Sequence, residues 1–251
     1  MPKWWIGCSG FHYKHWRDNF YPEGLATKNW FEYYCRHFNA VELNVTFYRF
    51  PTVPFLKTFH ERSPEAFRFA VKAPRAITHY KKFVNATEFL NSFYDTVNKG
   101  LKEKIGCILF QLHPRTAYSE EKMQQIIECL DPAFPNVVEC RHESWWNDKV
   151  YKEFAKHNIT FCGISHPTLP DDVIVNNPLV YYRFHGTPEL YKTPYSIDFQ
   201  KHVEETIKSK RKSKEVFLFF NNDIDVNAPR NAAQMQELTA RKTSRIHPSV
   251  A

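Results

Sequence analysis

Polar residues of two chemical kinds stand where short apolar runs of this sequence end. The first kind can exchange protons with a substrate: the carboxylates of Glu42 and Glu139, the amine of Lys72 and the imidazole of His185. The second kind can hold a substrate, because guanidinium forks bind phosphate or carboxylate oxygens and amides or phenols bind hydroxyl groups. We expect the first four residues to be catalytic and the following set to bind substrate: Asn44, Tyr48, Gln111, Arg141, Arg183 and Asn221.

The expected chemistry is general acid and base catalysis on a small anionic substrate, phosphorylated or carboxylated, or on a polyhydroxyl substrate. Glu42 or Glu139 would act as the general base, and Lys72 or His185 as the proton donor. Two carboxylates across a pocket would also suit a glycosidase, but the surrounding cations favour an anion over a neutral sugar. We therefore expect an enzyme of the hydrolase, lyase or isomerase type, without a redox cofactor.

The elements that must position these residues are short β-branched or aromatic runs separated by longer segments. We predict eight strands over 4–7, 40–43, 68–71, 107–111, 137–140, 160–164, 180–184 and 216–220. Helical spacing of apolar residues lies between them at 30–38, 89–97, 123–130, 199–207 and 232–238. Ser119 is expected to cap the third of these helices, and Gly100 to stop the second.

Alternation of strands and helices predicts a parallel sheet, and eight strands in a chain of this length favour a TIM-type (β/α)8 barrel. Pro167, Pro170 and Pro178 interrupt the segment after the sixth strand, so the crossover between strands 6 and 7 is expected to be a loop. The alternative is an open doubly wound sheet, which would move the site to a switch point. One domain over 1–251, with a short basic C-terminal tail from about 240, accounts for the composition.

Side-chain parity places the polar residues together, because alternate residues of a barrel strand face the interior. Each lies at the C-terminal end of its strand, where active sites of this architecture are built. Gly7, Ser9 and Ser165 are expected to add small side chains to the same interior. Glu139 with Arg141, or Glu42 with Lys72, could also be structural ion pairs, but desolvating so many charges costs several kcal/mol for each ion, which favours a ligand site.

The net charge points to a second class of function, nucleic-acid binding. Its formal value is +7, and the sequence pI is about 9.0. The basic residues that account for it are peripheral: Lys208, Lys210, Arg211, Lys212, Lys214, Arg241, Lys242 and Arg245. With Tyr13, Trp16, Trp145 and Trp146 available for stacking, a nucleic-acid-binding or repair-type protein is the alternative. The near-neutral body of the chain favours the small-molecule enzyme.

Metal and nucleotide cofactors are not expected. Glu42, Glu139, His142, His166 and His185 could share an ion in a metal-dependent hydrolase or isomerase, but no H-x-H or H-E-x-x-H occurs. Lys72 and Arg141 would also repel a divalent cation nearby. The seven glycines form neither G-x-G-x-x-G nor G-x-x-x-x-G-K-[ST].

Apolar runs are short, since the longest, 216–220, falls far below the ~20 residues that a membrane span needs. The opening residues do not resemble a signal peptide, so we expect a cytoplasmic protein without a membrane partner. The six cysteines contain no C-x-x-C, which favours reduced, mostly buried thiols over disulfides or zinc.

Short phrases at these strand ends, spread over essentially the whole chain, resemble the YecE-like family, a domain of unknown function (DUF72). The matching phrases are Gly7-Cys8-Ser9-Gly10, Val41-Glu42-Leu43-Asn44, Phe69-Ala70-Val71-Lys72, Leu109-Phe110-Gln111-Leu112, Glu139-Cys140-Arg141-His142, Tyr182-Arg183-Phe184-His185-Gly186 and Phe219-Phe220-Asn221-Asn222. The resemblance implies a TIM-type barrel and no settled activity. Two phrases depart from the family pattern: His113 stands where a proline is usual, and Ser165-His166-Pro167 stands where an acidic residue is expected.

Overall fold

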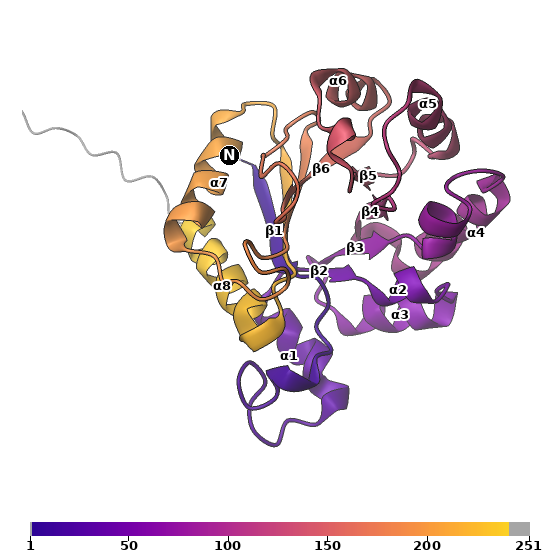
Figure 1. The fold of residues 1–251 in the computed structure, drawn as a ribbon. Helices are drawn as coiled ribbons and strands as arrows, with labels where there is room; N and C mark the ends of the chain where they lie inside the picture. Colours follow the sequence, from indigo (N-terminus) through magenta and orange to yellow (C-terminus); the bar gives the residue numbers. More distant parts are fainter. Residues whose placement is uncertain (1, 241–251) are drawn as a thin grey trace, which may run out of the picture.

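The computed structural model describes residues 2–240, and its centre is one sheet of eight parallel strands. The strands are β1 (Lys3–Cys8), β2 (Ala40–Leu43), β3 (Arg68–Lys72), β4 (Ile105–Gln111), β5 (Asn136–Glu139), β6 (Thr160–Ser165), β7 (Leu179–Phe184) and β8 (Glu215–Phe220). Hydrogen bonding runs in the order β1-β8-β7-β6-β5-β4-β3-β2. The sheet curls into a nearly closed barrel, seen from one end in Figure 1. The predicted barrel is therefore confirmed, and the open doubly wound sheet is not.

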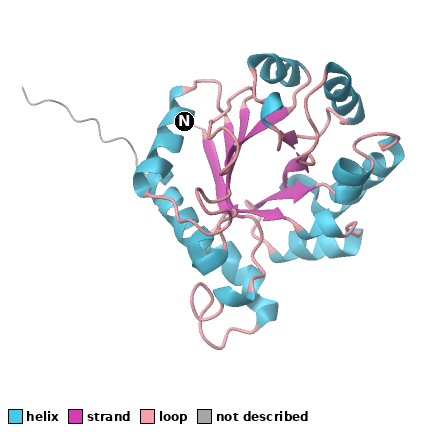
Figure 2. Cartoon of the chain, viewed as in Figure 1, coloured by secondary structure: helices cyan, strands magenta, loops and turns pink. Residues whose placement is uncertain are grey.

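Helices surround the sheet (Figure 2). They are α1 (Trp30–His37), α2 (Val45–Tyr48), α3 (Val53–Arg62), α4 (Thr87–Leu101), α5 (Glu120–Cys129), α6 (Asp148–Lys156), α7 (Ile197–Ser209) and α8 (Asn227–Ala240). Shorter helical turns occupy Lys14–Trp16, Thr27–Asn29, Ala76–Tyr80, Lys102–Lys104, Glu143–Trp145 and Ile224–Val226. No helix forms between β6 and β7, all of which the structure describes, so the predicted loop crossover is confirmed.

Alternate strand residues divide the core into two layers, as barrel geometry requires. The inner layer is closed by apolar side chains from all eight strands: Trp5, Ala40, Ala70, Cys107, Leu109, Val137, Cys162, Ile164, Tyr181, Phe217 and Phe219. The outer layer, between strands and helices, contains Cys8, Val41, Val71 and Phe184, which alternate with inward positions. Apolar side chains therefore fill the interior of the barrel, and the polar residues gather at the mouth formed by the C-terminal ends of the strands.

The barrel is closed between β1 and β2 by side chains instead of a backbone ladder. The hydroxyl of Tyr34 accepts from the Cys8 amide at 2.7 Å and donates to the Ala40 carbonyl at 2.9 Å. Asn39 forms a second bridge nearer the start of β1. Its side chain accepts from the Ile6 amide and donates to the Trp4 carbonyl. These two residues satisfy buried backbone groups that would otherwise lack partners.

Glycine at position 7 permits this side-chain bridge. A Cβ atom there would lie 2.0 Å from the Ala40 carbonyl oxygen and 2.5 Å from the Tyr34 hydroxyl. β1 and β2 could not then approach closely enough for Tyr34 to reach both strands.

Ser119 caps α5 as predicted, accepting from the Lys122 amide, whereas the prediction for Gly100 is wrong. Gly100 lies inside α4, which continues to Leu101, and the positive φ follows at Lys102. A Cβ at Gly100 would lie 2.4 Å from the Cβ of Leu56, so this glycine allows α3 and α4 to pack closely.

All six cysteines are free, and four of them are buried. No helix of the described residues is long and apolar enough to cross a bilayer. The basic residues of the tail, Arg241, Lys242 and Arg245, lie outside the described residues.

We predict that Tyr34→Phe lowers the free energy of unfolding by about 1–3 kcal/mol, because it leaves the Cys8 amide and the Ala40 carbonyl buried without partners. Urea unfolding followed by circular dichroism measures the change. Tyr33→Phe on the same helix is the matched control, since the Tyr33 hydroxyl bonds none of the described residues. Equal stability of the two variants would contradict the bridging role of Tyr34.

Candidate functional site

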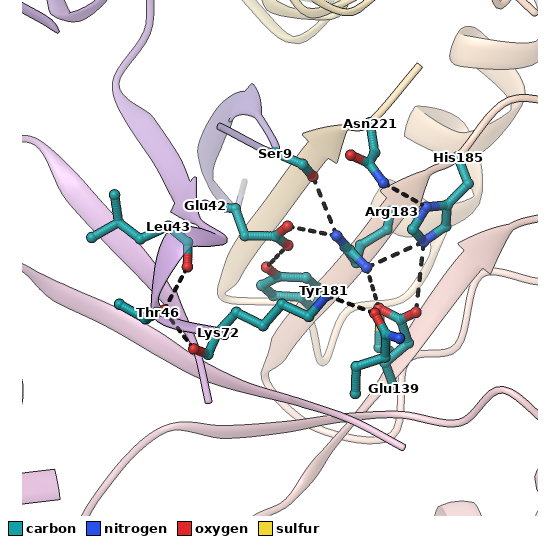
Figure 3. Close-up of polar contacts among 12 residues, drawn as sticks. Ser9, Glu42, Leu43, Thr46, Lys72, Glu139, Tyr181, Arg183, His185 and Asn221 are labelled. Carbon is teal, nitrogen blue, oxygen red and sulfur yellow. Dashed lines mark hydrogen bonds and ion pairs between the residues drawn. The ribbon is translucent and has the colours of Figure 1, made fainter. Parts of the chain in front are cut away.

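A buried arginine joins the two predicted carboxylates at the mouth of the barrel (Figure 3). Arg183 on β7 is 1% exposed and donates from Nη1 to Glu139 Oε2 at 2.5 Å and from Nη2 to Glu42 Oε1 at 2.6 Å. The hydroxyl of Tyr181 donates to the other oxygen of Glu42 at 2.6 Å. Strands β2, β5 and β7 thus meet in one ion-pair network. Glu42 pairs with Arg183, not with Lys72 as the structural alternative suggested.

Glu139 is bound by a second arginine, because Arg141 donates from Nε to Glu139 Oε1. Burial raises the pKa of Glu139, but the charges of Arg141 and Arg183 outweigh it and hold that pKa well below its ordinary value. The carboxylate therefore stays ionised, and each of its oxygens accepts a bond from a guanidinium. The expected role of Glu42 and Glu139 as general bases stays a prediction.

His185 is fully buried among cations. Its Nε2 lies 3.1 Å from Arg141 Nη2 and 3.3 Å from Arg183 Nη1, and its Nδ1 lies 2.9 Å from the Asn221 amide nitrogen. Burial, followed by the charges of Arg141 and Arg183, lowers the pKa of this imidazole well below its ordinary value. A neutral His185 would be a poor proton donor at neutral pH, so its donor role also stays a prediction.

Lys72, at the end of β3, differs from the other charged residues because no carboxylate among the described residues is close enough to pair with it. Its Nζ donates to Gln111 Oε1 at 2.7 Å and lies 4.2 Å from the centre of the Phe47 ring. Burial, and then the charge of Arg183, lowers the pKa of Lys72 from 10.5 to about 7. This amine can therefore change its protonation state near neutral pH.

The two remaining substrate-binding candidates lie at different depths. Asn44 follows β2 and lines a cavity of about 350 Å³ together with Ser9, Tyr13 and Glu42. Its Oδ1 atom is buried and has no hydrogen-bond partner in the described chain. Tyr48 is 69% exposed, and the guanidinium of Arg75 lies 5.6 Å from its ring centre. The structure thus places Asn44 beside the network and Tyr48 on the outer rim.

The predicted interior position of Ser165, at the end of β6, is wrong. Ser165 was expected inside the barrel, but its hydroxyl lies 3.2 Å from that of Thr187, whereas Ile164 belongs to the inner layer. The next residue, His166, reaches the mouth instead, with its ring centre 5.8 Å from that of His185. The inner positions of β6 are even-numbered, and a polar residue one position away cannot share their face.

Sequence reasoning did not select Tyr181, although it has the same parity on β7 as Arg183 and His185. It also missed the pair His79 and His113, whose ring centres are 5.2 Å apart. His113 is the residue that departs from the family phrase. Its position near Lys72 could be inferred only from the adjacency of β3 and β4.

Metal-binding geometry does not appear in residues 2–240, where no group of three or more His, Cys, Asp and Glu side chains is placed to hold an ion. His142 instead bonds the Ser144 hydroxyl, with Nδ1 and Oγ 2.8 Å apart. We therefore make no proposal from the metal-dependent alternative.

We predict that Arg183→Met lowers the free energy of unfolding by about 3–5 kcal/mol, because it leaves Glu42 buried without a cationic partner and removes one of the two arginines that bind Glu139. Adding Glu42→Gln to this variant should recover most of the loss, because Glu139 keeps its bond to Arg141. Chemical denaturation measures all three proteins. Arg62→Met is the surface control, because the exposed Arg62–Glu32 pair is worth only about 0–1 kcal/mol. A mild effect of Arg183→Met, similar to the control, would contradict a desolvated network.

Comparisons with known proteins agree with this architecture. The model of the family described as "Protein of unknown function DUF72" matches residues 5–251. The UPF0759 protein YunF of Bacillus subtilis strain 168 is 25% identical over 269 residues, which cover 92% of this chain and 94% of that protein. The UPF0759 protein YecE of Escherichia coli K12 is 30% identical over 117 residues, which cover 46% of this chain and 42% of that protein.

Two crystal structures of family members share the fold. A DUF72 family protein from Thermotoga maritima MSB8 superimposes with a TM-score of 0.83 at 25% identity, over 95% of this chain and 100% of that one. A DUF72 family protein from Enterococcus faecalis V583 gives a TM-score of 0.81 at 21% identity, over 99% of each chain. With the YecE-like phrases at the strand ends, the family match over nearly the whole sequence shows that this chain belongs to the DUF72 family of proteins of unknown function.

Proposed function

We propose that the protein is an enzyme that binds a small anionic substrate at the mouth of the barrel and uses Lys72 as its acid and base. The observation that carries this proposal is the buried Lys72 amine, whose pKa is lowered to about 7. General acid–base groups work best when their pKa lies near the working pH. Gln111 holds the amine in place at 2.7 Å.

Charge balance favours an anionic ligand. Glu42 and Glu139 offset the two arginines that they bind, Arg141 and Arg183. A protonated Lys72 adds a positive charge that no carboxylate of the described chain compensates within ion-pair distance. A phosphate or carboxylate on the substrate would supply the missing partner.

The residues then divide into reactive and positioning groups. Lys72 would donate a proton to the substrate as an ammonium or accept one as an amine, and Arg141 would bind the oxygen on which negative charge develops. Glu139 orients Arg141 through its bond to Nε. In this proposal Glu42 and Glu139 fix the arginines and do not act as general bases, and Gln111, Asn44 and Asn221 bind hydroxyl groups.

We predict that sulfate binding weakens by about tenfold or more between about pH 6 and about pH 9, because Lys72 loses its proton on passing its pKa of about 7. Sulfate is the probe because it keeps its charge over this range, and calorimetry measures its affinity. Lys72→Met should bind sulfate weakly at both pH values. Lys99→Met, which removes an exposed lysine of α4, should behave like the wild type. Sulfate affinity that is unchanged by pH or by Lys72→Met would refute the proposal.

Nucleic-acid binding is the second candidate, supported by a stack on the outer rim. The guanidinium of Arg75 lies between the exposed rings of Tyr48 and Tyr80, at 5.6 and 5.4 Å from their centres. Such rings can stack on unpaired bases. If this function holds, a single-stranded oligonucleotide will bind with an affinity that falls steeply with salt and is lost in a Tyr48→Ala, Tyr80→Ala protein. Fluorescence titration at two salt concentrations tests it, and salt-independent binding would exclude a phosphate-driven interaction.

A further inference from the structure

A largely apolar cavity adjoins the ion-pair network on the side of β1 and β2. It measures about 350 Å³, within the range of roughly 300–1,000 Å³ found for small-molecule sites. Its apolar walls come from Phe11, Phe55 and Phe59, together with Leu43 and Val45. Its polar lining is made by Ser9, His12, Tyr13, Glu42 and Asn44.

The three phenylalanines form an aromatic wall. The rings of Phe55 and Phe59 meet edge to face at 5.0 Å with an interplanar angle of 89°, and Phe11 lies 5.9 Å from Phe59. Phe55 remains 38% exposed. Aromatic pairs that are stacked or edge-on gain more than the burial of their area alone supplies, so this wall favours a planar aromatic occupant.

Asn44 gives the cavity one unmet hydrogen bond. Its Oδ1 atom is buried and has no hydrogen-bond partner in the described chain. A buried amide oxygen without a hydrogen bond loses the bond to water that it makes in the unfolded chain, which is unfavourable. An N–H or O–H group on a ligand would remove that cost, which specifies a donor on the edge of the ring.

The cavity lies next to the ion-pair network of the proposed anion site. Glu42 forms part of its lining and also binds Arg183, and Ser9 lies 3.5 Å from the same guanidinium (Figure 3). The hydroxyl of Thr46 lies between the carbonyls of Leu43 and Lys72, at 2.8 and 2.6 Å, and shares its one hydrogen between them, which holds the edge of the cavity against the strand that carries Lys72. The two regions are therefore neighbours, and the substrate that we propose below would span them.

We propose that this cavity binds a planar aromatic or heteroaromatic ring of the substrate, that an N–H or O–H on the ring donates to Asn44, and that the substrate is therefore an aromatic anion. The anionic half of this inference rests on the function proposed above. The ring-binding half rests on the phenylalanine wall and Asn44 alone, so the two can fail separately.

Calorimetric titration with phenyl phosphate, inorganic phosphate and phenol tests the two halves: phenyl phosphate tests the ring together with the anion, and phenol tests the ring together with its donor to Asn44. We expect phenyl phosphate to bind at least about tenfold more tightly than inorganic phosphate, a difference of about 1.4 kcal/mol. Phenol, which carries a donor and no charge, should bind weakly but measurably. If the two phosphates bind equally and phenol does not bind, the aromatic inference is overturned while the anion site stands. If phenol binds and neither phosphate does, the anion site fails while the ring site stands.

Two variants test the residues assigned to the ring. Phe55→Ala should weaken phenyl phosphate binding about tenfold and leave inorganic phosphate binding unchanged. Asn44→Ala should weaken phenol binding several-fold; it removes no helix cap, because the Asn44 side chain makes no capping bond to α2. Ile197→Ala, an exposed apolar residue of α7, is the matched control and should bind all three probes as the wild type does. Wild-type binding by both site variants would overturn the assignment.

Discussion

The ion pairs of Arg183 are the constraint on which the mouth of this barrel depends. A guanidinium that is 1% exposed cannot remain charged without partners, and Glu42 and Glu139 supply them from strands on either side. This arrangement fixes where the next charges go, because Arg141 takes the remaining oxygen of Glu139 and Tyr181 takes that of Glu42. Each oxygen of both carboxylates then accepts a bond from the network, and in our account these carboxylates hold the arginines and do not accept protons.

In our account, the groups that react with or bind the substrate are polar groups outside these ion pairs. Lys72 is buried beside Arg183 but has no acidic partner among the described residues, and its bond to Gln111 does not offset the loss of water. The unpartnered oxygen of Asn44 is a similar exception on the opposite side of Glu42. Satisfied and unsatisfied polar groups thus lie side by side, and in our account the unsatisfied ones mark where the substrate belongs.

The sequence was most informative where regular geometry applies. Strand periodicity located all eight strands, and parity brought Glu42, Lys72, Glu139 and Arg183 to one mouth. The expectation failed at Ser165, because the inner positions of β6 are Cys162 and Ile164 and Ser165 lies on the other face. Tyr48 lies in α2, beyond the end of β2, where strand parity gives no information. The sequence also could not predict which carboxylate binds which cation, because every carboxylate at the mouth has several cations near it. The prediction for Gly100 was wrong for a different reason. Glycine is required where two helices pack closely as well as at helix ends, and the sequence alone does not distinguish the two cases.

The protonation state of Lys72 is the most direct test of this account. Lysine labelled with carbon-13 and followed by NMR from about pH 5 to about pH 11 gives the titration of each amine, with Lys72→Met to assign the signal. The account predicts a midpoint near 7 for Lys72. A midpoint close to the ordinary value of 10.5 would mean that the amine is solvated or paired. That result would contradict the proposed role of Lys72 as the acid and base of the site.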